Sequence, residues 1–397
     1  MPKSKKAASD FLVVCFGLFL LAIMTVTTLR PKDTYSYYEN RNLATIHEAT
    51  AEEILTGEWT SNIDKYLSDH AAGRNTLLKA STYINCHILR QPVVNDVVIT
   101  ENCLLPEISD WMLDTSLIEG QTAAITQNLT SLSDLVESYG GVYYYVATPC
   151  QYVFHSDDYP WFMNNRSHYT EQSLAALSAS LQEAGVRFID IGQCFAAHGW
   201  ADHLSSAIDN HYSMHGAYLT YLEIMERIHA DTGFDVEILR DGDYQIQELP
   251  NRYLGSRTRK LMGLWPCEER LSILLPNVEV PFIRKNNHNE TASTVYSLPN
   301  NQWEDVLYSL YMGGDIALTE IDTGREELPS ILVYGDSFTN AAECILYYGF
   351  DKMYSIDMRH YKETTLGEFI SAHKPDIVVC IRDYEALLSV DGNGCGA

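Results

Sequence analysis

Basic residues are scarce in this sequence of 397 residues. Lys and Arg number 27 against 53 Asp and Glu, which gives a formal net charge of −26. Binding to nucleic acid or to anionic lipid needs clustered cations, so this balance argues against a nucleic-acid partner and against peripheral adhesion to a membrane surface. Hydrophobic residues make up 46% of the chain, which is the composition of an ordinary globular protein and not of a disordered one.

The nine cysteines include no C-x-x-C pair, and no tight Cys/His spacing indicates a zinc site. We therefore expect neither a cofactor nor a metal. Cys344 and Cys380 lie in apolar runs and are predicted to be buried thiols. The odd total and the irregular spacing argue against a disulfide framework. Two pairings remain open outside the cell, Cys86 with Cys103 and Cys150 with Cys194.

Charge is absent from residues 11–29, FLVVCFGLFLLAIMTVTTL. At about 1.5 Å per residue a helix of this length just spans a bilayer core. No A-x-A-like cleavage site follows, which favours a transmembrane anchor over a cleaved signal peptide. Basic residues flank the run on both sides, and the short tail of residues 1–10 favours a cytoplasmic N-terminus. The sequence therefore predicts a single-pass protein of the cell membrane with its main domain extracytoplasmic.

Short apolar strands alternate with amphipathic helices in the later part of the chain. This alternation is typical of an α/β fold, a parallel sheet with helices on both faces, in which ligands bind at the carboxyl ends of the strands. Periodicity and turn residues predict strands at 142–148, 186–191, 331–334, 353–356 and 376–381, and helices at 121–139, 170–184, 214–228, 339–348 and 366–373.

The remaining segments complete the predicted organisation. Residues 30–110 are expected to form a helical and hairpin segment packed on the core, with a β-hairpin over 93–105 that turns at Thr100-Glu101-Asn102. The α/β domain is assigned to 111–390. Within it, residues 235–330 break the alternation and read as a large insertion with some β-structure. The last residues, 391–397, are expected to be frayed.

Ser337 lies in Gly335-Asp336-Ser337-Phe338, between a predicted strand and a predicted helix. A serine on such a sharp turn is a candidate nucleophile, because the N–H groups and the dipole at the helix start can stabilise an oxyanion. Gly335 gives the turn a backbone with few steric limits. The alternative is a plain helix start, since Asp and Ser are ordinary N-caps.

The segment Asp209-Asn210-His211-Tyr212 supplies the other two groups that acyl transfer needs. In a loop, Asp209 can turn back to hold one nitrogen of His211, which leaves the other nitrogen free to accept a serine proton. Two alternatives remain open at this point. The segment can be an ordinary surface loop, or Asp209, His211 and His215 can be ligands of a cation.

Two further residues are candidates for oxyanion or substrate binding. Asn340 lies one turn after Ser337, so its amide is either an additional oxyanion donor or the side chain of an exposed helix residue. Arg359 follows a strand end, where it either contacts substrate or forms a salt bridge with Asp357 or another carboxylate.

The chain resembles the DHHW family, relatives of the SGNH-hydrolase-like proteins that O-acetylate exported polysaccharides such as alginate. The resemblance runs over about residues 35–390, and an ordered series of segments carries it. The chain departs from the motif that names the family at Asn210 and Tyr212, neither of which is a position of the catalytic triad. The matching segments are Glu39-Asn40-Arg41-Asn42-Leu43, Tyr66-Leu67-Ser68-Asp69-His70 with Arg74, Asp209-Asn210-His211-Tyr212 with Gly216-Ala217, Tyr253-Leu254-Gly255-Ser256, Tyr311-Met312-Gly313-Gly314-Asp315, Gly335-Asp336-Ser337-Phe338 and Ile356-Asp357-Met358-Arg359-His360-Tyr361.

The resemblance implies an SGNH-like (flavodoxin-like) three-layer α/β fold and a catalytic triad of Ser337, His211 and Asp209. It implies that the Asp-x-His loop precedes the serine in the chain, the reverse of most SGNH hydrolases, and that Arg359 matches a basic position of the related acetyltransferases. The implied function is O-acyl transfer, with O-acetylation of a cell-envelope polysaccharide and a membrane-bound acyltransferase as acyl donor.

Two other functions fit the same residues. A carbohydrate esterase or deacetylase would use the same triad and release the acyl group to water. A non-catalytic surface protein that binds carbohydrate or serves as a scaffold would keep the fold while the insertion over 235–330 blocks the pocket.

Overall fold

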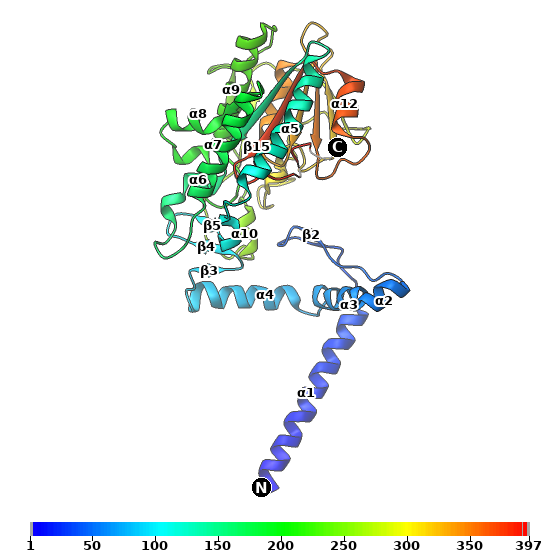
Figure 1. The fold of residues 1–397 in the computed structure, drawn as a ribbon. Helices are drawn as coiled ribbons and strands as arrows, with labels where there is room; N and C mark the ends of the chain where they lie inside the picture. Colours follow the sequence, from blue (N-terminus) through cyan, green and yellow to red (C-terminus); the bar gives the residue numbers. More distant parts are fainter. Residues whose placement is uncertain (1–2, 391, 395–397) are drawn as a thin grey trace. The chain divides into compact units, whose positions relative to one another are not determined.

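A computed structural model describes residues 3–390 and 392–394 of the chain. The chain divides into two compact units (Figure 1). The N-terminal unit comprises Met1–Asp96 and Thr258–Pro266, and the main unit comprises Val97–Arg257 and Cys267–Ala397. The packing of the N-terminal segment on the core stays a prediction.

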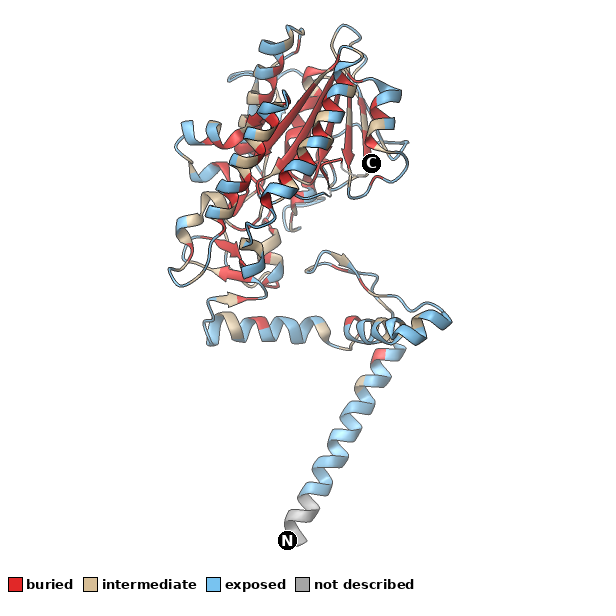
Figure 2. Cartoon of the chain, in the orientation of Figure 1, coloured by how far each residue is buried: buried red, intermediate tan, exposed pale blue. Residues whose placement is uncertain are grey.

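The N-terminal unit begins with α1 (Lys3–Leu29), in which Ser9–Leu29 is long and apolar enough to cross a membrane. Nearly all described side chains of this helix are exposed (Figure 2), as expected of a segment that meets lipid. The unit continues with β1 (Tyr35–Ser36), β2 (Arg41–Asn42), α2 (Ala51–Thr56), α3 (Glu58–Asp69), α4 (Arg74–Tyr83), a π-helical turn (Ile84–Ile88) and β3 (Val93–Val94).

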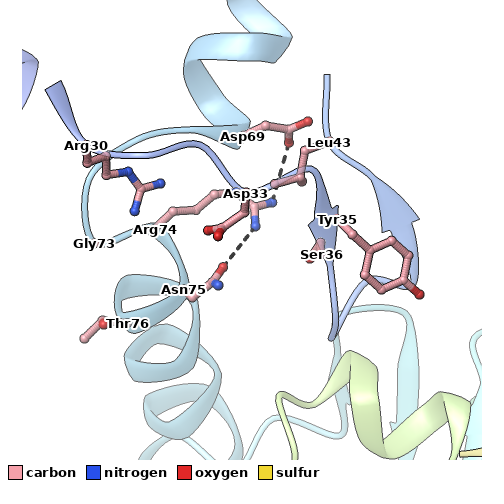
Figure 3. Close-up of a pocket in the computed structure, with 10 residues that line it drawn as sticks. All are labelled: Arg30, Asp33, Tyr35, Ser36, Leu43, Asp69, Gly73, Arg74, Asn75 and Thr76. Carbon is pink, nitrogen blue, oxygen red and sulfur yellow. Dashed lines mark hydrogen bonds and ion pairs between the residues drawn. The ribbon is translucent and has the colours of Figure 1, made fainter. Parts of the chain in front are cut away.

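Asp69 organises the N-terminal unit. Its carboxylate is buried and accepts two hydrogen bonds from the Arg41 guanidinium, at 2.8 and 2.6 Å, and one from the Ala44 N–H at 2.9 Å. The hydrogen bonds of Arg41 hold the pKa of Asp69 well below its usual value. A cavity of about 140 Å³ beside Asp69 is also lined by Arg30 and Arg74 (Figure 3). The hydrogen bonds of Asp69 tie the segment after α1 to α3.

The main unit is built on an eight-stranded sheet in the order β11-β10-β12-β14-β13-β15-β6-β7. The five strands from β14 to β7 are parallel, as the sequence predicted, and the central three of them, β13, β15 and β6, are almost entirely buried (Figure 2). Their bounds are β6 (Val142–Thr148), β7 (Arg187–Asp190), β13 (Ile331–Gly335), β14 (Lys352–Asp357) and β15 (Ile377–Asp383). The predicted helices are present as α5 (Ile118–Glu137), α7 (Ser167–Glu183), α9 (Met214–Thr232), α11 (Thr339–Leu346) and α12 (Leu366–His373).

The helices form two layers, one on each face of the sheet. Across the sheet, the step from β6 to the next parallel strand, β7, runs in one direction, whereas the step from β13 to β14 runs in the opposite direction. Because such crossovers are right-handed, α7 and α11 lie on opposite faces. Helix α5 contacts α7 and α12 on one face, and α9 contacts α11 and α8 (Ile191–Ala197) on the other. The SGNH-like three-layer fold is thus present, with the last strand, β15, inserted between β6 and β13.

The insertion over residues 235–330 extends the sheet, which the sequence did not predict. Strands β10 (Ile283–Asn286), β11 (Asn289–Thr291) and β12 (Leu318–Asp322) continue it beyond β14, and all three are antiparallel to their neighbours. Strands β8 (Tyr244–Glu248) and β9 (Ser272–Pro276) form a separate antiparallel pair. All three strands that extend the sheet are short and carry several polar or charged residues (IRKN, NET and LTEID), so they lack the apolar runs that identify buried strands.

Several short elements complete the described chain. The predicted β-hairpin is present as β4 (Val97–Ile99) and β5 (Leu104–Pro106), and its turn lies at the predicted residues. The remaining short helices are 3₁₀ turns at Asp110–Leu113, Ser156–Asp158, Asp202–Leu204, Tyr308–Leu310 and Tyr347–Gly349, together with α6 (Gln151–Phe154) and α10 (Ser256–Lys260).

The cysteines within the described residues are all free thiols, so neither Cys86–Cys103 nor Cys150–Cys194 is bonded. Cys344 and Cys380 are buried, as predicted. Of the tail predicted to fray, residues 391 and 395–397 lie outside the described residues. Asn393 is fully buried and accepts a hydrogen bond from Tyr145 at 3.0 Å, so this part of the tail is packed.

Candidate active site

Ser337 lies on a sharp turn between β13 and α11, at the carboxyl edge of the sheet. A glycine precedes the turn because the backbone of β15 passes very close: a Cβ on Gly335 would lie 2.1 Å from the carbonyl oxygen of Ile381. The Ser337 side chain is half-buried. Its N–H forms no hydrogen bond with the described part of the chain, so it is free to bind a developing oxyanion.

Asp336 fixes the conformation of this turn. Its Oδ1 accepts the N–H of Phe338 at 2.9 Å, and its Oδ2 forms a buried ion pair with Arg382 at 2.7 Å. Asp336 therefore holds the turn that precedes α11, whereas the side chain of Ser337 remains available for another partner. Neither Asp336 nor Ser337 is the N-cap of α11, a position that Phe338 occupies.

The second part of the site is the loop of residues 205–212, which precedes α9. Ser205 and Tyr212 form an antiparallel bridge that closes the loop. Two neighbouring segments hold it: the Leu104 N–H donates to Ala207 O at 2.8 Å, and the Gln151 N–H donates to Asn210 O at 3.1 Å. Gln151 follows β6, and this contact brings the loop to the carboxyl edge of the sheet, where Ser337 also lies.

The structure brings the three predicted triad residues together. His211 Nε2 lies 2.8 Å from Ser337 Oγ, and His211 Nδ1 lies 2.5 Å from Asp209 Oδ1. Asp209 is 1% exposed and His211 is 7% exposed, so the hydrogen bond between them is shielded from water, whereas the bond to Ser337 is part-buried. A carboxylate on Nδ1 fixes the tautomer in which Nε2 accepts a proton from the hydroxyl. This arrangement can activate Ser337 as a nucleophile.

Asp209 is held as a carboxylate despite its burial. Burial alone raises the pKa of this carboxyl, but the charge and hydrogen bond of His211, together with hydrogen bonds from the Ser256 N–H and the Tyr253 side chain, lower it below the usual value. The Ser256 N–H donates to Asp209 Oδ2 at 2.5 Å. Gly255 allows this approach, since a Cβ there would lie 2.5 Å from Ile208 O.

Aromatic rings fix the His211 imidazole from the sides. Tyr308 stacks on it with the ring centroids 3.6 Å apart and the planes at 4°, and the Phe338 ring lies at 4.8 Å. Tyr212 donates a hydrogen bond from its hydroxyl to Phe338 O, which ties the histidine loop to the serine turn. Asn210 accepts a hydrogen bond from Ser256 Oγ at 3.0 Å. The two departures from the family motif, Asn210 and Tyr212, thus both make contacts that support the site.

Asn340 and Arg359 belong to one polar network. Asn340 is buried, and its Nδ2 donates to Asp315 Oδ1 at 3.0 Å. Arg359 pairs with Asp315 at 2.9 Å and binds both carboxylate oxygens of Asp357, at 2.9 and 2.6 Å. Burial opposes the charge of Arg359, but these carboxylates raise its pKa above the usual value. The salt bridge with Asp357 that the sequence left open is therefore present. Asp357 is the partner of Gly335 in the pairing of β14 with β13. Arg359, just after β14, therefore lies at the same edge of the sheet as Ser337, just after β13.

The three ligands considered for a cation, Asp209, His211 and His215, are not gathered around a common point among the described residues. Asp209 and Ser337 are the groups that lie against the two ring nitrogens of His211. Within the described residues, the His/Cys/Asp/Glu groups close enough to share an ion lie elsewhere, and one of them contains Asp315 and Asp357. There the Arg359 guanidinium already occupies the space between the two carboxylates.

Sequence reasoning gave no role to four residues that support the triad: Ser256, Tyr253, Tyr308 and Glu269. All four come from the insertion, which therefore completes the site. The segment Tyr253-Leu254-Gly255-Ser256 was noted as a match to the family, and that match was the available signal. Tyr308 and Glu269 carry no local pattern, because only the tertiary fold brings them to the loop.

The fold and these contacts define a class of protein, an SGNH-like α/β protein with a hydrogen-bonded serine, histidine and aspartate at the carboxyl edge of its sheet. The sequence matches no protein-family model and no curated protein. Solved structures are similar. PatB1 of Bacillus cereus with a sulfonyl adduct has a TM-score of 0.61 at 19% identity, and the match covers 73% of this chain and 95% of that one.

A second structure of PatB1 gives a TM-score of 0.60 at 17% identity, with coverage of 73% and 96%. A DHHW family protein from Eubacterium siraeum gives a TM-score of 0.56 at 15% identity, with coverage of 75% of this chain and 93% of that one. At these identities the likeness is one of fold. The predicted relation to the DHHW family and to SGNH-like proteins is confirmed at that level.

Proposed function

We propose that this protein is a membrane-anchored, extracytoplasmic O-acyltransferase that forms an acyl-enzyme on Ser337. The observation that carries the proposal is the hydrogen-bonded series from Asp209 through His211 to Ser337, with contacts of 2.5 and 2.8 Å. His211 takes the hydroxyl proton as Ser337 attacks the acyl carbon of the donor, and Asp209 stabilises the imidazolium that forms. The bond from the acyl carbon to the donor's leaving group then breaks, and His211 returns the proton to that group. In the second half of the reaction, His211 takes the proton of the acceptor hydroxyl, which attacks the acyl-enzyme, and Ser337 is released with the proton from His211.

The tetrahedral intermediate needs donors where its negative charge develops. The Ser337 N–H at the start of α11 is one such donor. We assign Asn340 as the second. A side-chain amide has two N–H donors, and Asp315 uses only one of them. Arg359, partly exposed beside Asp315, supplies a positive charge at the same edge. Its proposed role is to bind the acceptor.

The acceptor is proposed to be a hydroxyl of a cell-envelope polysaccharide, and the acyl group an acetyl group. The DHHW resemblance suggests both, and it suggests a membrane-bound acyltransferase as acyl donor. The apolar helix Ser9–Leu29 would place the main unit beside such a partner. An esterase, in which water resolves the acyl-enzyme, is the alternative outcome, because it needs the same triad. A protein that only binds carbohydrate would keep the triad without an acyl-enzyme.

The first test is covalent labelling of the full-length protein with a serine-reactive fluorophosphonate. A sulfonyl reagent is a second probe, since one structure of the similar PatB1 carries a sulfonyl adduct. We expect labelling of the wild type and none of Ser337→Ala. The matched control is Ser371→Ala, at an exposed serine of α12, which should label like the wild type. Equal labelling of Ser337→Ala would refute Ser337 as the nucleophile.

The second test separates the transferase from the esterase and from the non-catalytic protein. The purified protein is given an activated acetyl ester with and without an acetyl-free polysaccharide, and both acetate release and polymer acetylation are measured. Polymer acetylation that depends on Ser337 supports the proposal. Acetate release that the polymer does not alter would identify an esterase. Neither reaction, together with polymer binding, would indicate a non-catalytic protein.

A further inference from the structure

A second cluster of reactive side chains lies in the main unit, outside the triad. It consists of Cys103, which is 1% exposed, with His155 and Asp158. The Cys103 Sγ lies 3.6 Å from Asp158 Oδ2, and the His155 Nδ1 lies 3.1 Å from the same oxygen. The proposed acyl transfer uses none of the three. From their geometry we propose that they bind a divalent transition-metal ion, Zn²⁺ being the best match.

The distances fit the edges of a tetrahedral zinc site. With Zn–S of about 2.3 Å and Zn–O or Zn–N of about 2.1 Å, tetrahedral geometry separates S from O by roughly 3.6 Å and N from O by roughly 3.4 Å. The observed separations of 3.6 and 3.1 Å lie close to these values. Thiolate, imidazole and carboxylate are also the three ligand types that Zn²⁺ uses in proteins. The Asp158 side chain is 31% exposed, so a water molecule can complete the site.

Local structure already orients the three ligands. The turn before β5 fixes Cys103, whose N–H donates to Thr100 Oγ1 at 3.0 Å, while the same hydroxyl lies 3.3 Å from Sγ. His155 and Asp158 are three residues apart around a 3₁₀ turn, a spacing that places side chains on the same side. His155 Nε2 is buried and has no hydrogen-bond partner among the described residues. Within the described chain, the hydrogen bond of this ring is therefore the one to Asp158.

The other acidic cluster of the main unit shows the contrast. Asp315, Asp357 and His360 also lie close together, but Arg359 binds both carboxylates there and supplies the positive charge. No arginine or lysine pairs with Asp158 in the described part of the chain. Its carboxylate meets only an imidazole and a thiol, which is an arrangement that a cation would stabilise.

The location of the cluster indicates what the metal would do. Cys103 is followed by Leu104, whose N–H donates a hydrogen bond to Ala207 O in the histidine loop. On the other side, the His155 N–H donates a hydrogen bond to Gln151 O. The backbone N–H of Gln151 donates to Asn210 O of that loop. Its side-chain Nε2 donates to Leu104 O at 2.9 Å. An ion held by Cys103 and His155 would therefore join the two segments that position the loop. On binding, the Cys103 thiol forms the S–Zn bond and releases its proton to solvent.

The test is a titration of the untagged full-length protein in detergent with Co²⁺, followed by displacement with Zn²⁺. We expect one equivalent of Co²⁺ to give the thiolate-to-cobalt charge-transfer absorption, which Zn²⁺ then abolishes. Cys103→Ser should lose the band. Asp158→Asn, at a partly exposed side chain, should keep the fold and weaken binding by at least the roughly 10–100-fold that the loss of a group supporting a ligand costs, because Asp158 is itself a ligand.

Matched controls are Cys194→Ser, at a half-buried thiol on α8, and Asp157→Asn, at the neighbouring carboxylate. Both should titrate like the wild type. Absence of the band in the wild type, or its persistence in Cys103→Ser, would overturn the proposal. So would unchanged affinity in Asp158→Asn. The readout is metal binding alone, so its outcome is independent of whether Ser337 forms an acyl-enzyme.

Discussion

At the scale of single residues, His211 is the most constrained group of the site. Asp209 holds one ring nitrogen, Ser337 lies against the other, and Tyr308 covers a ring face. Rotation of the imidazole would break two hydrogen bonds and a stacking contact together. The base is therefore preorganised, and catalysis needs no further movement of this side chain.

Asp209→Asn should leave the histidine in place but remove the charge that stabilises its protonated form. An amide can also favour the wrong tautomer of His211. We expect the rate of fluorophosphonate labelling to fall by about 10³-fold or more, and we propose to measure it as a second-order rate constant. Asp202→Asn, at an exposed position, is the control and should label normally. A fall of only a few-fold would argue against Asp209 as the residue that orients His211.

At the scale of elements, the turn between β13 and α11 depends on a close approach to β15. Gly335→Ala would place a Cβ 2.1 Å from Ile381 O, where neither backbone can yield without moving a strand. We expect a loss of at least about 2–3 kcal/mol in the free energy of unfolding, which is typical of overpacking in a dense core. Labelling of Ser337 should also be lost.

Gly367→Ala is the matched control for this substitution. Gly367 lies in α12, and a Cβ there would meet only a Leu135 side-chain carbon at 3.8 Å. Alanine is favoured over glycine in a helix by about 1 kcal/mol, so this variant should be equally or more stable. Thermal unfolding of both variants checks the pair. Equal melting temperatures would show that the approach of β15 does not constrain the turn.

Besides Asp209, a second carboxyl group contacts the loop of residues 205–212, namely that of Glu269. Its Oε2 accepts the Ala207 N–H at 2.8 Å. Burial raises the pKa of Glu269 to about 7, although hydrogen bonds from the Ser206 side chain and the loop backbone oppose this shift. At neutral pH this group is therefore poised between the neutral and the charged form, beside the charge of Asp209.

This shift predicts a pH dependence of stability. A carboxyl whose pKa is higher in the folded state keeps its proton where the unfolded chain has released it, so stability falls as the pH rises from about 4.5 to about 7. Glu269→Gln should remove up to roughly 3 kcal/mol of this fall. Melting temperatures at pH 5 and pH 8 measure it, with Glu268→Gln, at an exposed neighbour, as control. Identical profiles for wild type and Glu269→Gln would contradict the assignment.

At the scale of the whole molecule, the chain combines a helix able to cross a membrane with a strongly acidic body. We expect the full-length protein to resist carbonate extraction from membranes, and protease added to intact cells to digest its main unit. Leu20→Arg places a charge near the middle of the helix at a cost of about 3 kcal/mol, which should weaken insertion. Digestion only after permeabilisation would indicate the opposite orientation.

Local patterns in the sequence determined much of this protein. Apolar runs of strand length and amphipathic helices ending at glycine predicted the five parallel strands and their helices, because both signals depend on neighbouring residues alone. The serine turn and the Asp209/His211 loop were also found from sequence. Both were expected where an α/β sheet carries its functional loops, and the resemblance to the DHHW family implied one site before any distance was known.

Tertiary structure decided what local pattern could not. The insertion extends the sheet and brings Tyr308, Ser256 and Glu269 against the histidine loop, although these residues lie far from Ser337 or His211 in the chain. The cluster of Cys103 with His155 and Asp158 is likewise invisible in the spacing of the cysteines. Sequence periodicity records which face of an element is buried, whereas the partner of each side chain depends on how distant elements pack, and only the folded chain determines that.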